Sequence, residues 1–231
     1  MKRTRDGYVP ASGFLQEQME AMPELKHPSM PRFEVHEYAP LLDSSNMTPA
    51  EWVKIAHDID ANYARYDGFV VLHGTDIEIN WDVVRPPGNR RRLVVQDLAA
   101  PVVSALRLFP GISPELVRNV LRPPLQGLVL EAYGVGNGPE NDRDFIAALA
   151  EATSRGVVIV DCTQCLEGSV DLGEYATGSA LARAGVISGY DMTAEAALAK
   201  MYYLFSRGWA PAKVKREMQR DLRGELTIRS V

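Results

Sequence analysis

The sequence predicts an α/β protein in three layers, built from two domains that each contain a parallel sheet. Short apolar runs alternate with segments of helical periodicity, which is the pattern of parallel strands joined by helices. The clearest run, residues 69–72, contains no polar side chain and is predicted to be a buried strand. We expect an N-terminal βαβ domain over residues 1–97 and a smaller C-terminal α/β domain over residues 101–231.

The composition of the 231-residue chain narrows the possible functions. Its formal net charge of −5 argues against nucleic acid as the main partner. No apolar stretch approaches the roughly 20 residues of a membrane-spanning helix, and the basic first residues lack the apolar core of a signal peptide. Two cysteines, Cys162 and Cys165, give no disulfide framework. We therefore expect a cytoplasmic protein without a membrane or nucleic-acid partner.

The first domain is predicted from two strands on either side of a well-marked helix. Residues 33–38 alternate between apolar and polar side chains and indicate a strand. Thr48 suits the N-cap of a helix, Pro49 its first position and Glu51 the closing position of a capping box. That helix leads to the strand at 69–72, which completes a strand, helix, strand unit.

The second domain is predicted from further strands that alternate with helices. A hairpin is expected at 77–95, within the first domain. From residue 101 onward, apolar runs indicate strands at 102–108, 127–131 and 157–160. Thr193 is expected to cap one of the closing helices. The helices expected in this domain lie at 113–121, 145–152, 179–184, 194–205 and 211–222.

Two polar loops follow the strands of the first domain, at the carboxyl ends where open α/β sheets bind ligands. One contains Asp43, Ser44 and Ser45, and the other contains Thr75 and Asp76. Together they offer carboxylates, hydroxyls and amides around one cavity. A carboxylate can bind the ammonium of a zwitterion while hydroxyls and amides bind its carboxylate, so an amino acid is the expected ligand. Helix capping is an equally good account of the second loop.

The glycines at 134, 136 and 138 form a second candidate loop. They loosely resemble a dinucleotide-binding loop, but Pro139 takes the position of its third glycine. A turn that brings the backbone close to a small ligand or a neighbouring subunit is the favoured interpretation.

Cys162 and Cys165 have C-x-x-C spacing. No second pair of ligands for zinc is present, and the 4 histidines are scattered, so no metal is expected. A thioredoxin-type site would place the pair at the start of a helix, which the following loop disfavours. Structural or ligand-contacting roles of Thr163 and Gln164 are the more plausible alternative.

A family resemblance rests on the segment 68–76, which resembles the signature Gly-x-aliphatic-x-x-His-Gly-Thr-Asp-Thr of the bacterial L-asparaginases. More widely, the chain is similar to the cytoplasmic type I enzymes along almost its whole length. The further segments that carry this similarity, all in the family order, are 7–13, 36–38, 42–45, 133–137, 163–165, 175–178 and 222–226.

The resemblance implies hydrolysis of L-asparagine to L-aspartate and ammonia through a threonine acyl-enzyme, without a cofactor. It also implies a homotetramer built from close dimers. Thr75 would be the second catalytic threonine and Asp76 its partner, while the side chains of Asp43, Ser44 and Ser45 would hold the α-carboxylate and ammonium of the substrate.

The resemblance assigns further roles outside these two loops. Tyr8 matches the tyrosine of the mobile loop that closes over the site, and Asn137 matches the position where the neighbouring subunit approaches. Thr163, Gln164 and Cys165 resemble part of an allosteric effector site for asparagine.

The chain also departs from the family pattern. The loop Thr-Gly-Gly-Thr-Ile-Gly, which holds the nucleophilic threonine, precedes the region that Met1 matches. After Asp76, roughly ninety family residues, including the catalytic lysine, are expected to be absent. Glu131 stands where type I relatives carry an arginine of the effector site. We expect impaired catalysis, with a non-catalytic amino-acid-binding or assembly module as the alternative. A lysophospholipase activity has no support, because no Gly-x-Ser-x-Gly elbow exists.

Overall fold

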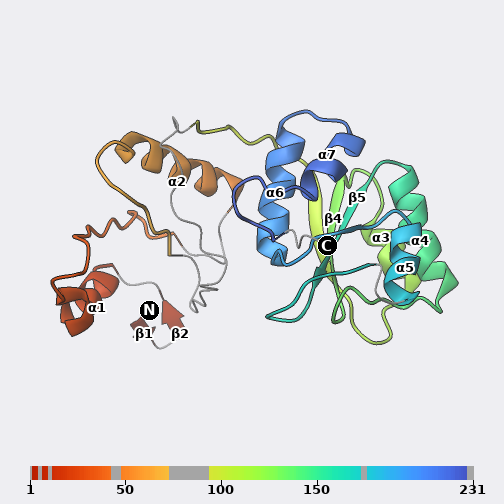
Figure 1. Cartoon of the computed structure of the whole chain (residues 1–231), viewed down its shortest axis with the longest axis horizontal. Coiled ribbons are helices and arrows are strands. Elements are labelled where there is room, and N and C mark those ends of the chain that lie inside the picture. The colour runs from red at the N-terminus through yellow and green to blue at the C-terminus, as the bar shows by residue number, and fades with distance from the viewer. Residues whose placement is uncertain are drawn as a thin grey trace. The chain divides into compact units, whose positions relative to one another are not determined.

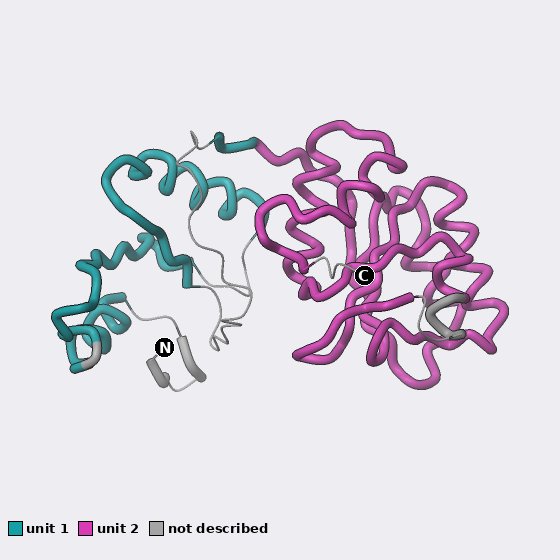
Figure 2. Tube along the Cα trace, viewed as in Figure 1, with its two compact units in different colours: residues 1–78, 91–96 teal, residues 79–90, 97–231 magenta. Residues whose placement is uncertain are grey.

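The computed structural model of the chain divides into two compact units (Figure 2). Unit 1 comprises residues 1–78 and 91–96, and unit 2 comprises residues 79–90 and 97–231. The residues that the structure describes are 2–4, 7–9, 12–42, 48–72, 94–172 and 176–227.

The described part of unit 2 is built around a four-stranded parallel sheet in the order β3-β4-β5-β6. This confirms the α/β class and the parallel sheet predicted for the second domain. The last strand has only two residues, which is too short for a recognisable pattern in the sequence. The strands are β3 (Val103–Arg107), β4 (Gly127–Ala132), β5 (Val158–Thr163) and β6 (Ile187–Ser188).

Helices cover both faces of this sheet, with α3, α4 and α5 on one side and α6 and α7 on the other (Figure 1). Phe145 and Leu149 of α4 are fully buried on the first side, and Met201 and Leu204 of α6 are fully buried on the second. The helices are α3 (Pro114–Val120), α4 (Arg143–Ser154), α5 (Ala176–Arg183), α6 (Ala194–Ser206) and α7 (Pro211–Met218).

Side-chain caps explain where three of these helices begin. The hydroxyl of Ser113 accepts a hydrogen bond from the backbone of α3, and Thr193 does the same for α6, as predicted. Asp142 accepts from two backbone amides at the start of α4. Such caps satisfy amides that have no partner within the helix.

The chain after α7 is held by a buried lysine. The Lys200 ammonium lies 2.6 Å from a carboxylate oxygen of Glu225 and donates to the carbonyls of Met218 and Arg220. Glu225 also accepts from the backbone amide of Arg223. The helix α7 ends at Met218, earlier than the predicted residue 222, and Lys200 binds the carbonyl of this last helical residue.

Unit 1 contains less regular structure. Its described elements are a pair of antiparallel strands, β1 (Lys2–Thr4) and β2 (Gly7–Val9), the helices α1 (Phe14–Ala21) and α2 (Pro49–Asn62), and the short 3-10 helix η1 (Pro23–Lys26). Thr48 caps α2, and its backbone amide donates to Glu51 at 2.8 Å, so the predicted capping box is confirmed. No helix in the described part of the chain is both long and apolar enough to cross a membrane.

The strands predicted at 33–38 and 69–72 are not formed, so this detail of the N-terminal prediction is wrong. The side chain of Val70 is 86% exposed, although the sequence predicts burial. Among the described residues, none before Leu108 is buried. A strand needs a paired neighbour and a covered face, and among the described residues neither is found for 33–38 or 69–72. Most of the expected hairpin at 77–95 lies outside the described residues.

Leu149 of unit 2 is buried and Val70 of unit 1 is exposed, so substitutions at these two positions test the difference in burial between the units. Leu149→Ala leaves a cavity in a fully buried site and should lower the free energy of unfolding by about 2–5 kcal/mol. Val70→Ala should change it by less than about 0.5 kcal/mol, because the exposed side chain loses no packing. Urea unfolding followed by far-UV circular dichroism measures both, and equal losses would contradict the structure.

Limited proteolysis should separate the two units. Cleavage needs a locally opened backbone, and few buried contacts hold unit 1 closed, so its residues should be cut first. A fragment close to residues 97–231 should persist and be identified by mass spectrometry. Cleavage at similar rates throughout the chain would show that unit 2 is not the more stable unit.

Candidate functional site

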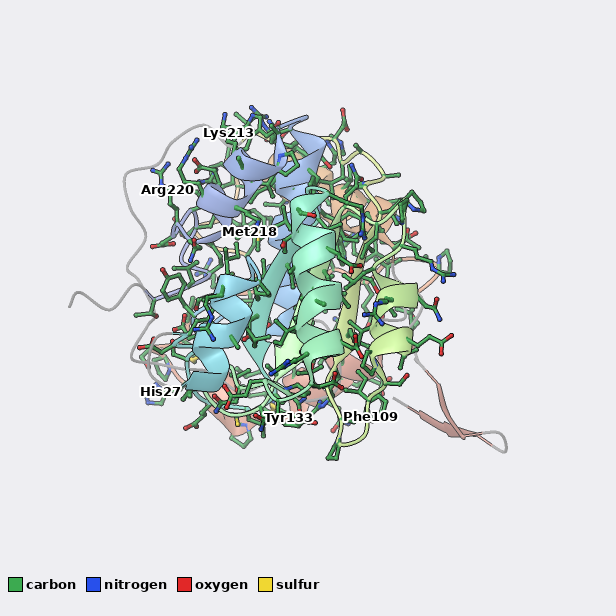
Figure 3. All side chains as sticks on the ribbon, turned by 90° about the vertical axis from the view of Figure 1, so that its right-hand side faces the viewer. His27, Phe109, Tyr133, Lys213, Met218 and Arg220 are labelled. Atoms are coloured by element: carbon green, nitrogen blue, oxygen red, sulfur yellow. The ribbon has the colours of Figure 1, made fainter. Side chains whose placement is uncertain are left out.

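The candidate site of unit 2 lies where β3, β4 and β5 end. Phe109 and Tyr133, which follow β3 and β4, lie at the same end of the unit, whereas Lys213 of α7 lies at the opposite end (Figure 3). Open α/β sheets bind ligands at the carboxyl ends of their strands. Thr163 is the last residue of β5, and Gln164 and Cys165 follow it at this same end.

Gln164 ties three strand ends together. Its side-chain amide Nε2 donates to the carbonyls of Leu108 at 2.7 Å and Glu131 at 2.8 Å. Its backbone amide donates to the carbonyl of Ala132 at 2.9 Å. Gln164 therefore holds the ends of β3, β4 and β5 in register, and the donor capacity of its side-chain nitrogen is used within the protein.

Thr163 fixes the turn that follows β4. Its hydroxyl donates to the carbonyl of Gly134 at 2.5 Å and accepts from the backbone amide of Cys165 at 3.0 Å. The turn itself is closed by paired backbone hydrogen bonds of 3.0 and 2.8 Å between Tyr133 and Asn137.

The glycines of this turn are explained by its backbone. Gly134 has φ 52° and Gly136 has φ 103°, both in the left-handed region that favours glycine. A Cβ at Gly136 would lie 2.6 Å from a methyl carbon of Val170. The glycine pattern therefore builds a tight turn packed against residues of the same chain. The predicted approach of a ligand or a neighbouring subunit stays a prediction.

The two cysteines differ in environment. Cys162 is fully buried on β5, and burial, with smaller contributions from the charges of Asp161 and Glu131, raises the pKa of its thiol to about 12. Its thiol therefore stays protonated and unreactive at neutral pH. Cys165 is exposed, and both thiols are free. The described residues contain no group of three or more side chains suited to holding a metal ion.

Charge at this end of the sheet comes from β3 and β4. Arg107 and Glu131 are register partners on these strands, and their charged atoms lie 3.8 Å apart. The Arg107 side chain is 63% exposed, so this pair is a weak, solvent-screened interaction. Glu131 is also the register partner of Cys162 on β5, and its side chain is mostly covered.

Asp161 is a buried residue that was not part of the predicted site. It is 0% exposed, and neither of its carboxylate oxygens has a hydrogen-bond partner in the described part of the chain. Burial raises the pKa of this carboxyl to about 8. The available signal was a lone acidic residue directly after the apolar run at 157–160.

The structure brings together only part of the predicted site. Asn137, Thr163, Gln164 and Cys165 lie at one end of unit 2, where Thr163 contacts the turn that contains Asn137. Tyr8 lies in β2, where only the backbone is described. The residues outside the described part of the chain are Asp43, Ser44, Ser45, Thr75 and Asp76.

Unit 1 has a hollow of about 810 Å³ beside α2. Within it, the carboxylate of Asp58 accepts from the Tyr38 hydroxyl at 3.0 Å and lies 3.3 Å from Nε2 of His36. Burial, followed by the Asp58 carboxylate, raises the pKa of Tyr38 to about 12, so its hydroxyl remains a hydrogen-bond donor at neutral pH. His36 and Tyr38 belong to one of the segments that carry the family resemblance.

The chain matches two family models and several known proteins. Residues 1–77 match "Asparaginase, N-terminal", and residues 102–218 match "Glutaminase/Asparaginase C-terminal domain". L-asparaginase 1 of Escherichia coli (strain K12) is 36% identical over 320 residues, covering 98% of this chain and 94% of that protein. The chain therefore belongs to the asparaginase family of amidohydrolases. Within it, the chain is a homologue of the type I L-asparaginases.

Two further proteins are similar to this chain, one in fold and one in sequence. The crystal structure of L-asparaginase I from Vibrio cholerae O1 biovar eltor matches with a TM-score of 0.75 and 33% identity, over 99% of this chain and 95% of that chain. The 60 kDa lysophospholipase of Homo sapiens is 34% identical over 294 residues, covering 86% of this chain and 51% of that protein.

The alignment with the Escherichia coli protein is longer than the chain. Its 320 positions exceed the 231 residues by 89, so at least 89 of these positions have no counterpart here. The N-terminal family match ends at residue 77, and the C-terminal family match begins at residue 102. The 89 unmatched alignment positions agree in number with the roughly ninety residues expected to be absent after Asp76.

Two variants of Gln164 test its role at the strand ends. Gln164→Ala removes the donor from two carbonyls and should lower the free energy of unfolding by about 1–3 kcal/mol. Gln164→Glu should cost more, because it places carboxylate oxygens against those carbonyl oxygens. Thermal unfolding measures both, with Cys165→Ser as an exposed control. A melting temperature unchanged by either Gln164 variant would contradict the assigned role.

Proposed function

We propose that this chain carries an L-asparagine amidohydrolase site whose activity is impaired in the 231-residue form. The overall reaction is L-asparagine plus water to L-aspartate plus ammonia. The observation that carries the proposal is the similarity to a type I L-asparaginase over 98% of the chain. We retain residues 1–97 and 101–231 as the N-terminal and C-terminal asparaginase domains.

The proposed roles follow the polar loops of the N-terminal domain. The hydroxyl of Thr75 and the carboxylate of Asp76 act on the substrate amide, while Asp43 and the hydroxyls of Ser44 and Ser45 hold the α-ammonium and α-carboxylate. Tyr8 closes over the substrate, and Asn137 lies at its edge toward a neighbouring subunit. A neutral threonine hydroxyl is a weak nucleophile, so acyl transfer requires a nearby base.

Two observations support impairment. At least 89 positions of the alignment with the Escherichia coli relative have no counterpart in the chain. In addition, no described residue before Leu108 is buried, so the unit that carries the catalytic loops lacks a buried core there. Catalytic groups must be held within fractions of an ångström, which a rigid core provides.

The remaining features of the proposal concern setting and regulation. We place the protein in the cytoplasm as a homo-oligomer, a dimer or tetramer, acting on L-asparagine without a cofactor. Thr163, Gln164 and Cys165 are proposed as the effector segment. Its response to asparagine is expected to be weak, because the hydroxyl of Thr163 and the side-chain nitrogen of Gln164 already bind backbone carbonyls.

The second candidate is a non-catalytic module of the same fold that binds L-asparagine or L-aspartate, or that assembles with other subunits. It is favoured by the buried two-sided core of unit 2, which does not depend on the catalytic loops. Such a module would retain the fold and ligand recognition while lacking turnover.

Ammonia release from L-asparagine tests the proposal. The purified 231-residue chain should turn over orders of magnitude more slowly than an intact relative assayed in parallel, because a site without its full nucleophile and base set loses most of its rate enhancement. Any residual activity should fall by at least about tenfold in Thr75→Ala. Turnover equal to that of the intact relative, or activity unaffected by Thr75→Ala, would contradict the proposed impairment or site.

Thermal stabilisation by L-asparagine distinguishes the two candidate functions. Ligand that binds the folded state raises the melting temperature, so stabilisation without ammonia release would favour the binding module. Glycine serves as the control ligand, because it has the same α-ammonium and α-carboxylate but no side-chain amide. Ser44→Ala should reduce any stabilisation that depends on the proposed substrate loop.

A further inference from the structure

We propose that the Asp161 side chain is a pH-sensitive latch, which holds the turn from Tyr133 to Asn137 closed while its carboxyl is neutral and releases it on ionisation. The turn packs over this carboxyl at the end of β5. The proposal concerns the conformation of the turn and does not depend on catalytic activity.

The turn lies directly against the carboxyl of Asp161. A Cβ added to Gly136 would lie 2.9 Å from Oδ2 of Asp161 and 3.3 Å from a methyl carbon of Leu172. The backbone amide of Asp171 donates to the carbonyl of Val135 at 2.9 Å, which joins the turn to the segment 170–172. The turn and this segment together cover Asp161, which is 0% exposed.

Asp161 has no partner that would stabilise a negative charge. Neither oxygen accepts a hydrogen bond from a described residue, and its register partners on β4 and β6 are Leu130 and Ser188. The Ser188 hydroxyl is already bonded, since it donates to the carbonyl of Val170. An ionised carboxylate in this position would be buried and unpaired, which costs several kcal/mol and favours opening to water.

The surrounding titratable groups do not offset this cost. Strand side chains alternate between faces, so Cys162, Glu131 and Arg107 lie on the opposite face from Asp161. The turn and the adjoining segment contribute Tyr133 and Asp171, and burial is the sole cause of the raised pKa of Asp161, about 8. The helices on this face carry their described charges at exposed or half-exposed positions, namely Glu115, Arg118, Arg143, Asp144, Glu151 and Arg183.

The direction of the pH effect follows from linkage. The closed state binds the Asp161 proton more tightly than the open state, in which the pKa is near the ordinary 3.8. The closed state is therefore most favoured below about pH 4, and it loses stability as the pH rises to about 8. Over this window the open population should rise about tenfold per pH unit, and it should become constant above about pH 8.

Amide hydrogen exchange of the full chain, followed between about pH 5 and pH 9 and corrected for intrinsic rates, tests the latch. The reporters are the amides of Gly136, Asn137 and Asp171, which donate within the turn or to it. Their opening population should rise about tenfold per pH unit and then level off near pH 8. Amides within α6 should open far less often at every pH, because the turn opens without global unfolding.

Asp161→Asn is the matched variant, since it keeps the shape and cannot ionise, and Asp161→Ser provides a second, smaller uncharged side chain. In both variants the pH dependence of the turn amides should be lost. The proposal is overturned if these variants keep the slope, if the wild-type turn shows no slope, or if the turn amides exchange only as rarely as those of α6. The last result would mean that Asp161 affects global stability alone.

Discussion

A parallel strand is stable only when its edges are paired and both of its faces are covered, and the contrast between the two units follows from this constraint. In unit 2, β4 has a partner on each edge, helices on each face and fully buried apolar side chains. In unit 1, the apolar run 69–72 has no described strand beside it and remains exposed. An identical preference for extended structure therefore gives a strand in one unit and an irregular segment in the other.

At the carboxyl end of the unit 2 sheet, most polar side chains are hydrogen-bonded, but the carboxylate of Asp161 has no hydrogen-bond partner among the described residues. The side chains of Gln164 and Thr163 donate hydrogen bonds to carbonyls of neighbouring loops and strand ends. Their main role in the structure is therefore to fix these strand ends. Beside them, Asp161 is buried without a described partner. Polar groups in the interior are stabilising only when all are satisfied, so this carboxyl is the weakest point in an otherwise well-bonded region.

Much of the site chemistry was visible in the sequence because it is carried by short, ordered motifs. The segment 68–76 and the polar loop at 43–45 pointed to an amino-acid amidohydrolase, and the family matches confirm the family level of that inference. The roles of individual residues remain proposals, because five of the residues assigned to these loops lie outside the described part of the chain. The positive φ angles of Gly134 and Gly136 account for the glycines of the turn at 133–137, and its contact with a ligand or a neighbouring subunit remains a prediction.

The sequence by itself determined the local features of this asparaginase-family chain, namely the Thr48 and Thr193 caps and the strands and helices whose periodicity fits their surroundings. These depend on interactions among residues close in the chain. Only the tertiary structure decided whether 69–72 forms a strand, that β5 continues through Asp161 to Thr163, and that α7 stops at Met218. Each of these outcomes involves a partner distant in sequence, such as the neighbouring strand or the Lys200 ammonium, which local patterns do not encode.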